Sequence, residues 1–255
     1  MISITKNKIL RAIGRTAVST VFWLAVWEIT YRVVRNDLFV ASPLHVAARL
    51  GELAVTGEFW LSVGLSLLRI LLGFLLGSVL GTLFAILTTR RVCATLFTPL
   101  RVLIQATPVA SFIMLAWIWL KRDQIPVFIA MLIVLPVFWS NVRAGIRAVG
   151  RSEHELAKAY RFTRVMKLRH LYLPAVLPHF ASAASAGAGL VWKAGIAAEV
   201  LCQPKMAIGT ELFQAKSILE TTDVFAWTAV VVFISLILEI TLRTSLKRWE
   251  TRWNT

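Results

Sequence analysis

The stretch Ile70–Thr89, ILLGFLLGSVLGTLFAILTT, lies between two arginines and holds 20 residues without a charged side chain. A helix that crosses the hydrocarbon core of a bilayer needs about 20 mostly apolar residues. Gly73, Gly77 and Gly81 recur at every fourth position of this stretch, and small residues at that spacing let two membrane helices approach closely. The stretch therefore predicts a membrane-spanning helix whose glycine face packs against another helix.

Five further stretches of the chain have a similar character. Three of them contain no charge, and the first and the last are interrupted by one or two charged residues. The six predicted spans run from about Thr16 to Val34, from Arg69 to Arg90, from Arg101 to Lys121, from Asp123 to Arg143, from Arg169 to Lys193 and from about Asp223 to Thr241. Glu28 and Arg32 lie four residues apart in the first span and are expected to pair on one helix face. The sequence thus predicts an all-α polytopic membrane bundle of about six transmembrane helices.

The composition agrees with a membrane protein and excludes several other classes. Of the 255 residues, 58% are apolar and 16% are charged, whereas soluble domains average roughly 45–50% apolar and about 25% charged residues. A net charge of +15 can indicate nucleic acid, but Lys and Arg also collect in the cytoplasmic loops of membrane proteins, so no nucleic-acid partner is expected. The two cysteines and four histidines lack the spacing of a metal site, and no metal is predicted.

The distribution of Lys and Arg predicts the orientation of the chain. With the N-terminus inside, the inner segments carry 19 of these residues and the outer segments carry 7. Such an excess marks the cytoplasmic side of a membrane protein. We therefore expect both termini in the cytoplasm, with an N-terminal segment over residues 1–15, a single transmembrane domain over residues 16–248 and a short tail over residues 249–255.

The longest predicted cytoplasmic segment, from about Arg143 to Leu171, contains a helix-start signature. Ser152 is followed three residues later by Glu155, the spacing of a capping box, in which the two side chains satisfy backbone N–H groups at the start of a helix. A helix is predicted from Glu153 to about Tyr160. Further along, Pro174 is expected in the first turn of the fifth span, where its missing N–H group is tolerated.

The same segment resembles the EAA loop of ABC importer permeases. That pattern reads E-A-A, three residues, G, nine residues and I-x-L-P. In this chain Glu155-Leu156-Ala157 is followed after three residues by Arg161, and after nine more by Leu171-Tyr172-Leu173-Pro174. The spacing matches throughout, but Leu156 replaces an alanine and Arg161 occupies the glycine position at the turn. Because a non-glycine residue at positive φ is unfavourable, the geometry of this turn stays open.

The resemblance extends over most of the chain, from about Ser42 to Arg248, and points to the nitrate/sulfonate/taurine branch of these permeases. The segments that carry it are Ser42-Pro43 with Val46, Ser66-Leu67-Leu68-Arg69 with Gly73, Pro108, Gly145-Ile146-Arg147-Ala148-Val149, Ala198-Glu199, Ile208-Gly209 and Asp223-Val224-Phe225-Ala226. It implies a permease domain over residues 16–248 in a bacterial inner membrane, with the EAA-type loop at about residues 150–174.

The resemblance also implies partners. In that family the EAA loop forms a coupling helix that docks on a cytoplasmic ATPase. The chain has no GxxxxGK[ST] motif, so ATP and magnesium are expected on a separate ATPase dimer and no cofactor is expected in this chain. A second permease copy and an extracytoplasmic solute-binding protein complete the assembly, and the implied solute is a small anion such as nitrate, a sulfonate or taurine, or a small nitrogenous vitamin precursor. The residues assigned to ATPase coupling are Glu155, Ala157, Ala159, Arg161, Leu173 and Pro174.

Charged and aromatic residues within the predicted spans are candidates for the solute pathway. An ionisable group in a membrane is costly unless it faces water, the bundle interior or a partner. Lys193 and Glu199 are six residues apart and lie on different sides of a helix, so they need separate partners, and an ion pair to another span explains each as well as a solute does. The candidate pathway residues are Arg69, Trp117, Trp192, Lys193 and Glu199.

Two other classes of function remain open on the sequence alone. A stand-alone secondary transporter or channel is the main alternative, but the sequence shows no inverted repeat and few intramembrane charges for a proton relay. An integral membrane enzyme is the other, and no cluster of His, Asp, Glu or Cys marks a catalytic site. We therefore expect a transport subunit and not an enzyme.

Overall fold

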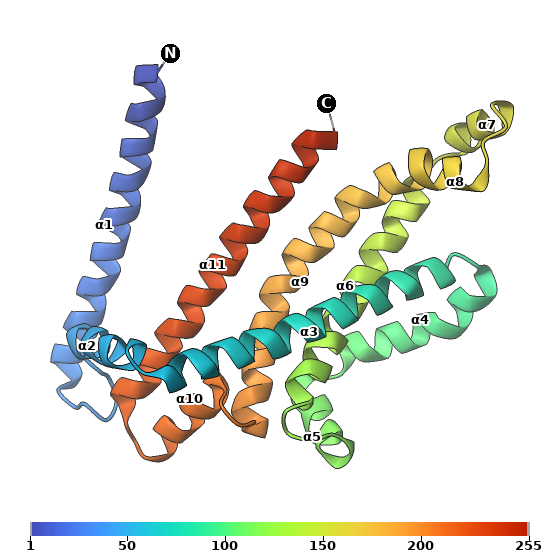
Figure 1. Ribbon diagram of the computed structural model, residues 1–255. Helices are drawn as coiled ribbons and strands as arrows, with labels where there is room; N and C mark the ends of the chain where they lie inside the picture. The colour runs from blue at the N-terminus through green and yellow to red at the C-terminus, as the bar shows by residue number, and fades with distance from the viewer. Residues whose placement is uncertain (1, 254–255) are drawn as a thin grey trace. The chain divides into compact units, whose positions relative to one another are not determined.

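The structure, a computed structural model, is built of helices joined by short loops (Figure 1). It describes the backbone of residues 2–253 and the side chains of residues 18–241 and 244. The predicted cytoplasmic segments over residues 1–15 and 249–255 therefore lie outside the described side chains. The helices are α1 (Ile2–Val34), α2 (Pro43–Ala54), α3 (Gly57–Leu87), α4 (Arg91–Ala106), α5 (Val109–Trp119), α6 (Ile125–Ala148), α7 (Arg151–Ala159), α8 (Arg164–Lys167), the π-helical turn η1 (Leu168–Tyr172), α9 (Leu173–Cys202), α10 (Ile208–Ser217) and α11 (Thr221–Trp253).

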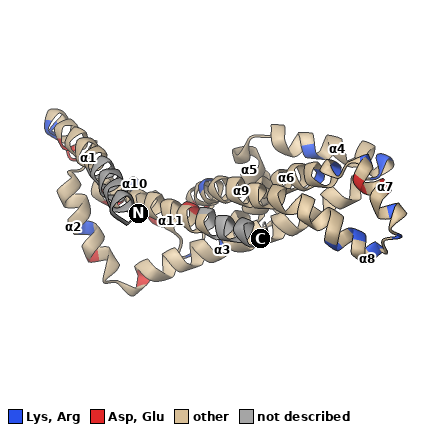
Figure 2. Cartoon of the chain, turned by 90° about the horizontal axis from the view of Figure 1, so that it is seen from above, with Lys and Arg blue, Asp and Glu red and all other residues tan. Residues whose placement is uncertain are grey.

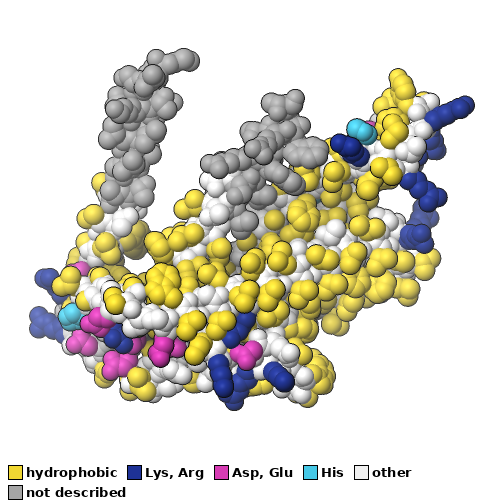
Figure 3. Space-filling model, viewed as in Figure 1, with side chains coloured by type: hydrophobic (Ala, Val, Ile, Leu, Met, Phe, Trp, Pro, Cys, Tyr) yellow, Lys and Arg dark blue, Asp and Glu magenta, His cyan; other side chains and the backbone are white. Residues whose placement is uncertain are grey.

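Four described helical segments are long and apolar enough to cross a membrane, and a bent helix pair would make a fifth. They are α3, α6, the run Arg164–Cys202 that ends with α9, and the Thr221–Thr241 part of α11. The all-α membrane bundle is confirmed, and hydrophobic side chains cover most of the face in view over α3 (Figure 3). The predicted first span, residues 16–34, lies in α1, whose described side chains begin at residue 18 and are too few to test it; within them Glu28 and Arg32 form the expected ion pair at 2.7 Å.

The predicted third span is not one continuous helix but the bent pair α4 and α5, which is long and apolar enough to cross a membrane only if the two helices are taken together. The chain is bent by 106° between α4 and α5. Thr107 is extended, with φ −81° and ψ 129°, and Pro108 follows it at the start of α5. The physical cause is Pro108, because a proline disfavours helical backbone in the residue before it and has no N–H group to continue the helical ladder.

The chain divides into two compact units. The first unit comprises Met1–Phe59 and Leu212–Val230, and the second comprises Trp60–Glu211 and Val231–Thr255.

The first unit joins the α1–α2 region to the start of α11. The Trp27 indole donates a hydrogen bond to the Ala41 carbonyl at 3.0 Å and stacks on Phe225, with ring centroids 5.6 Å apart. Arg49 on α2 donates to both carboxylate oxygens of Asp223 at 2.6 and 3.0 Å. A two-pronged pair of this kind fixes geometry as well as charge. The early segment near Ser42 and the segment at residues 223–226 therefore pack together, although more than 170 residues separate them.

The second unit is organised around α6. Helices α6 and α9 pack extensively against each other. The glycine face of α3 lies directly on α6, because a Cβ at Gly77 would come 2.6 Å from the Met131 carbonyl oxygen and one at Gly81 would come 2.5 Å from that of Leu135. Gly73 meets the α6 backbone in the same way. Only residues without a side chain permit this close approach.

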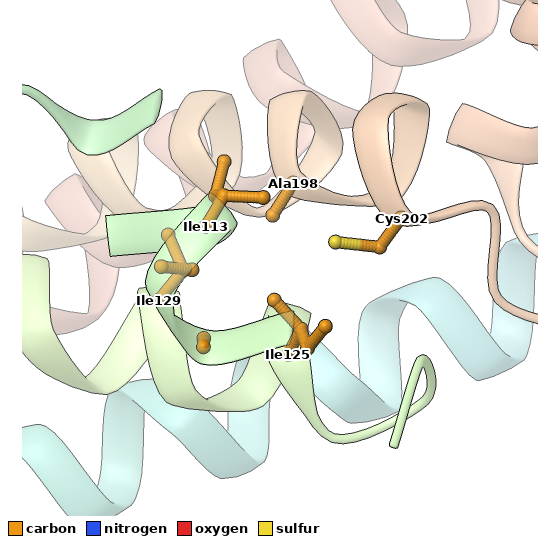
Figure 4. Close-up of a cluster of buried hydrophobic side chains, with 6 residues drawn as sticks. Ile113, Ile125, Ile129, Ala198 and Cys202 are labelled. Atoms are coloured by element: carbon orange, nitrogen blue, oxygen red, sulfur yellow. The ribbon is translucent and has the colours of Figure 1, made fainter. Parts of the chain in front are cut away.

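Short helix α5 is held against α6 and α9 by a cluster of buried apolar side chains. Figure 4 shows Ile113 from α5 beside Ile125 and Ile129 from α6, with Ala198 and Cys202 from α9 opposite them. None of these five side chains is more than 1% exposed. The break at Pro108 thus produces a short helix that returns into the packed interior.

Candidate functional site

The loop between α6 and α9 opens with α7. This helix begins at Arg151 with Gly150 at the cap position, so the capping box predicted from Ser152 and Glu155 is wrong. Glu153 stands at the third helical position instead. Its carboxylate accepts hydrogen bonds from its own backbone N–H, from the Ser152 hydroxyl and from the Gly150 N–H, and these hold its pKa below the ordinary value. Gly150 makes room for this arrangement, because a Cβ there would lie 2.5 Å from the Glu153 carboxylate.

The end of α7 is a Schellman motif, with Arg161 in the left-handed position. The Phe162 N–H donates to the Ala157 carbonyl at 2.9 Å, and the Arg161 N–H donates to the Lys158 carbonyl at 3.0 Å. Arg161 has φ 49°, a conformation usually taken by glycine at this point of the motif. The turn that the EAA pattern assigns to a glycine is therefore formed here with an arginine.

The surface of α7 differs from the sequence expectation. Ala157 is only 1% exposed and faces the interior of the loop, whereas Glu155 and Ala159 are exposed. Leu156 and Tyr160, which were not selected from the sequence, are 55% and 69% exposed. They lie four residues apart and share a helix face. Two apolar residues four positions apart in a mostly polar helix would have predicted this exposed apolar face from the sequence.

The second half of the loop is tied back to α7. The two ring nitrogens of His154 lie 3.0 Å from the Gly150 carbonyl oxygen and 3.1 Å from the Tyr172 hydroxyl. Pro174 lies in the first turn of α9, directly after the π-helical turn η1. Because Pro174 has no N–H for the helical ladder, a wider turn before it is a physical consequence. Lys and Arg residues gather on α4, α7 and α8 at this end of the second unit (Figure 2).

Glu199 is fully buried and lies in a polar network between α3, α9 and α10. One carboxylate oxygen accepts hydrogen bonds from the Ser66 hydroxyl at 2.7 Å and from the Gly209 N–H at 3.2 Å. The Ser66 oxygen in turn accepts from the Ile208 N–H at 3.0 Å. The carboxylate thus lies at the N-terminus of α10, where a negative charge is favourable.

Arg69 belongs to the same network. Its guanidinium lies 3.7 Å from the second Glu199 oxygen and donates hydrogen bonds to the carbonyls of Lys205 and Met206 at 2.8 and 3.2 Å. A further hydrogen bond reaches Asp123 at 3.0 Å. Arg69 and Glu199 are therefore brought together, and their partners attach the α9–α10 connection to α3.

Of the remaining candidate pathway residues, Trp192 and Lys193 lie at a cavity between α9 and α11, and Trp117 lies on α5. Lys193 lines a cavity of about 500 Å³ between α9 and α11. Trp192 forms part of the wall of this cavity, and its indole donates to the Val231 carbonyl at 3.0 Å. Trp117 is 40% exposed. The polar residues that line the cavity with Lys193 are Ser182, Ser185, Ser235 and Glu239.

The chain is thus a helical membrane bundle with an ordered loop between α6 and α9. Residues 73–253 match the family described as the inner membrane component of binding-protein-dependent transport systems. This match covers most of the chain, which therefore belongs to that family and is a permease component of an ABC importer. As the family description states, its members are inner membrane proteins.

Individual relatives support the same assignment. The chain is 26% identical over 259 residues to the taurine transport system permease protein TauC of Escherichia coli (strain K12), covering 97% of this chain and 91% of that protein. It is 26% identical over 207 residues to the putative aliphatic sulfonates transport permease protein SsuC of Bacillus subtilis (strain 168), covering 80% and 74%. A chain of a bacterial alginate ABC transporter has the same fold, with a TM-score of 0.61 and 16% identity over 96% of each chain.

Proposed function

We propose that this chain forms half of the solute pathway of an ATP-driven importer and couples to a separate ATPase dimer through α7. A second copy of the chain supplies the other half, and a solute-binding protein delivers the solute from outside. Both termini and the α7 loop lie in the cytoplasm. The chain carries out no chemical reaction itself, since ATP and magnesium are bound by the partner ATPase.

The observation that carries this proposal is the surface of α7. Hydrogen bonds to Glu153 cap the start of α7, and the Schellman hydrogen bonds cap its end. His154 also links the helix to Tyr172, so α7 is held rigidly. Its exposed face presents Leu156 and Tyr160 beside Glu155. Apolar side chains exposed next to a charge on a rigid helix suit docking into a groove of another protein. The Arg161 turn, Leu173 and Pro174 set the direction in which the chain leaves this helix and enters α9.

Substitutions on this face test the proposal. Leu156→Asp and Glu155→Lys are expected to abolish ATP-driven uptake in proteoliposomes and to lower ATPase co-purification, with the permease still inserted at normal levels. Leu219→Asp is the matched control, because Leu219 is 68% exposed but lies on the loop before α11. Normal ATPase binding and uptake by Leu156→Asp would overturn the coupling role of α7. Ala157→Asp is a poor test, since Ala157 is buried and its substitution damages the loop itself.

We propose a small organic anion, of the sulfonate class, as the solute. Lys193 places one positive charge beside three serine hydroxyls in the α9–α11 cavity, a combination that suits an oxyanion. Glu239 on the same cavity suits an amino group at the other end of the solute, as in taurine. Relatives named for taurine and aliphatic sulfonates support this class.

Uptake measurements with different solutes test this choice. Lys193→Met is expected to raise the KM for taurine and for an alkyl sulfonate at least about tenfold, which corresponds to about 1.4 kcal/mol. Glu239→Gln is expected to impair taurine more than the alkyl sulfonate. Lys121→Met, at an exposed position outside the cavity, is the control. Equal KM values for Lys193→Met and the unmodified chain would contradict the proposed solute, and a nitrogenous vitamin precursor without a negative charge would then be the better candidate.

A further inference from the structure

Helix α4 carries an arginine on its packing face. The half-buried positions of α4 recur with helical spacing, and Phe97 on this face contacts the ring of Phe84 with centroids 5.4 Å apart. Arg101 follows Phe97 by one turn on the same face and is half-buried. Because α4 packs against α6, this arginine points into an interface where an apolar residue is expected.

The α6 side of this interface is also cationic. Arg143 is half-buried near the end of α6, and Arg147 lies one turn further on. The Arg143 guanidinium lies within electrostatic range of Arg147 and Arg101. The Nε atoms of Arg101 and Arg143 are buried and have no hydrogen-bond partner. Two half-buried arginines, Arg101 and Arg143, therefore lie on helices that pack together, each with an unsatisfied buried donor, and Arg147, one turn beyond Arg143, is exposed.

The described part of the chain offers no counter-charge. None of its ion pairs or hydrogen bonds engages the side chains of Arg101, Arg143 or Arg147. In the sequence, the only acidic residues between Asp123 and Glu199 are Glu153 and Glu155, and Glu153 is engaged at the start of α7. A buried donor without a partner costs free energy and neighbouring like charges repel, so an anion from outside the chain would stabilise this cluster.

We propose that Arg101, Arg143 and Arg147 form a phosphate-binding site between α4 and α6, occupied by the headgroup of an anionic phospholipid. The guanidinium group matches a phosphate with two parallel hydrogen bonds. Basic pockets between transmembrane helices on the cytoplasmic side are places where anionic headgroups bind. Leu96, Leu100 and Leu103 are exposed on α4 around Arg101, and they offer an apolar surface to an acyl chain. Free phosphate has the same headgroup chemistry but gains nothing from this surface.

Thermal unfolding of the purified permease in a zwitterionic detergent tests the site. Phosphatidylglycerol is expected to raise the unfolding midpoint of the unmodified protein more than phosphatidylcholine does, at fixed ionic strength. Arg143→Gln and Arg101→Gln are expected to lose this difference. Without lipid, Arg143→Gln is expected to unfold at a higher temperature than the unmodified protein, because it removes a half-buried cation whose Nε donor is unsatisfied. Arg91→Gln is the matched control, since Arg91 lies on α4 but is exposed.

The outcomes separate the possible occupants. A midpoint that rises equally with phosphatidylglycerol and with millimolar inorganic phosphate would show that the acyl chain plays no part and would overturn the lipid assignment. A full response of Arg143→Gln to phosphatidylglycerol would overturn the site. If only co-purified ATPase stabilises the cluster, and Arg143→Gln abolishes that effect, a protein carboxylate is the occupant and the lipid proposal fails.

Discussion

Arg161 holds a backbone conformation that costs a non-glycine residue roughly 1–2 kcal/mol. The Schellman hydrogen bonds around it stabilise the turn in spite of this cost. We expect Arg161→Gly to raise the free energy of unfolding by about 1 kcal/mol and the unfolding midpoint by about 2–4 °C, since glycine adopts positive φ without strain. Differential scanning fluorimetry of the purified permease measures this change.

Lys158→Gly is the control for this substitution. It also removes a long cationic side chain, but from an exposed position within α7, where the backbone is right-handed helical. A glycine there is expected to lower stability by roughly 0.5–1 kcal/mol. If Arg161→Gly is less stable than the unmodified chain, the side chain of Arg161 contributes a contact that outweighs the cost of its backbone.

At the scale of elements, the sequence predicted the type of most helices because their apolar runs are long. It failed at two places where a single residue decides the local backbone. Pro108 breaks an apolar run that reads as continuous, and Glu153 replaces Glu155 at the start of α7 because Gly150, which precedes the helix, leaves room for its carboxylate. Neither effect is visible in hydropathy. The break depends on the missing N–H of Pro108, and the cap depends on the missing Cβ of Gly150.

The candidate site was only partly predictable for a different reason. Arg69 and Glu199 were selected from the sequence because an ionisable group in a membrane is costly. Their partners could not be predicted, because these lie on other elements. Ser66 and Gly209 were visible in the sequence only as parts of separate motifs, and the structure shows that these motifs meet around Glu199. Long-range pairing of this kind cannot be derived from helical periodicity in a single sequence.

The close packing of the α3 glycine face against α6 can be tested by substitution. Gly77→Leu is expected to lower the yield of folded permease and its thermal stability, because the new side chain would meet the Met131 backbone. Overpacking typically costs about 1–3 kcal/mol, and a rigid backbone neighbour makes the cost larger. Val79→Leu is the control, since Val79 is 58% exposed on the same helix. Equal yields and equal midpoints for the two variants would contradict a close α3–α6 interface.

For the whole molecule, the orientation proposed from the Lys and Arg distribution can be measured with single cysteines. In a background in which Cys93 and Cys202 are replaced by serine, a membrane-impermeant maleimide added to intact spheroplasts is expected to label Thr56→Cys. It should leave Ser152→Cys unlabelled until the membrane is broken. Both positions are exposed in the structure, so burial cannot explain a difference. Labelling of Ser152→Cys from outside would place the α7 loop on the wrong side for an ATPase.

Reconstitution decides between a permease that needs partners and a transporter that works alone. The sequence contains no GxxxxGK[ST] motif, and the proposed energy source is a separate ATPase. We expect no accumulation of taurine in liposomes that contain this chain alone, and uptake against a gradient once the ATPase, the solute-binding protein and ATP are added. An ATPase variant that cannot hydrolyse ATP is the control and should abolish uptake. Sustained uptake by the chain alone, driven by an ion gradient, would instead identify a secondary transporter, and the exposed face of α7 would then need a different explanation.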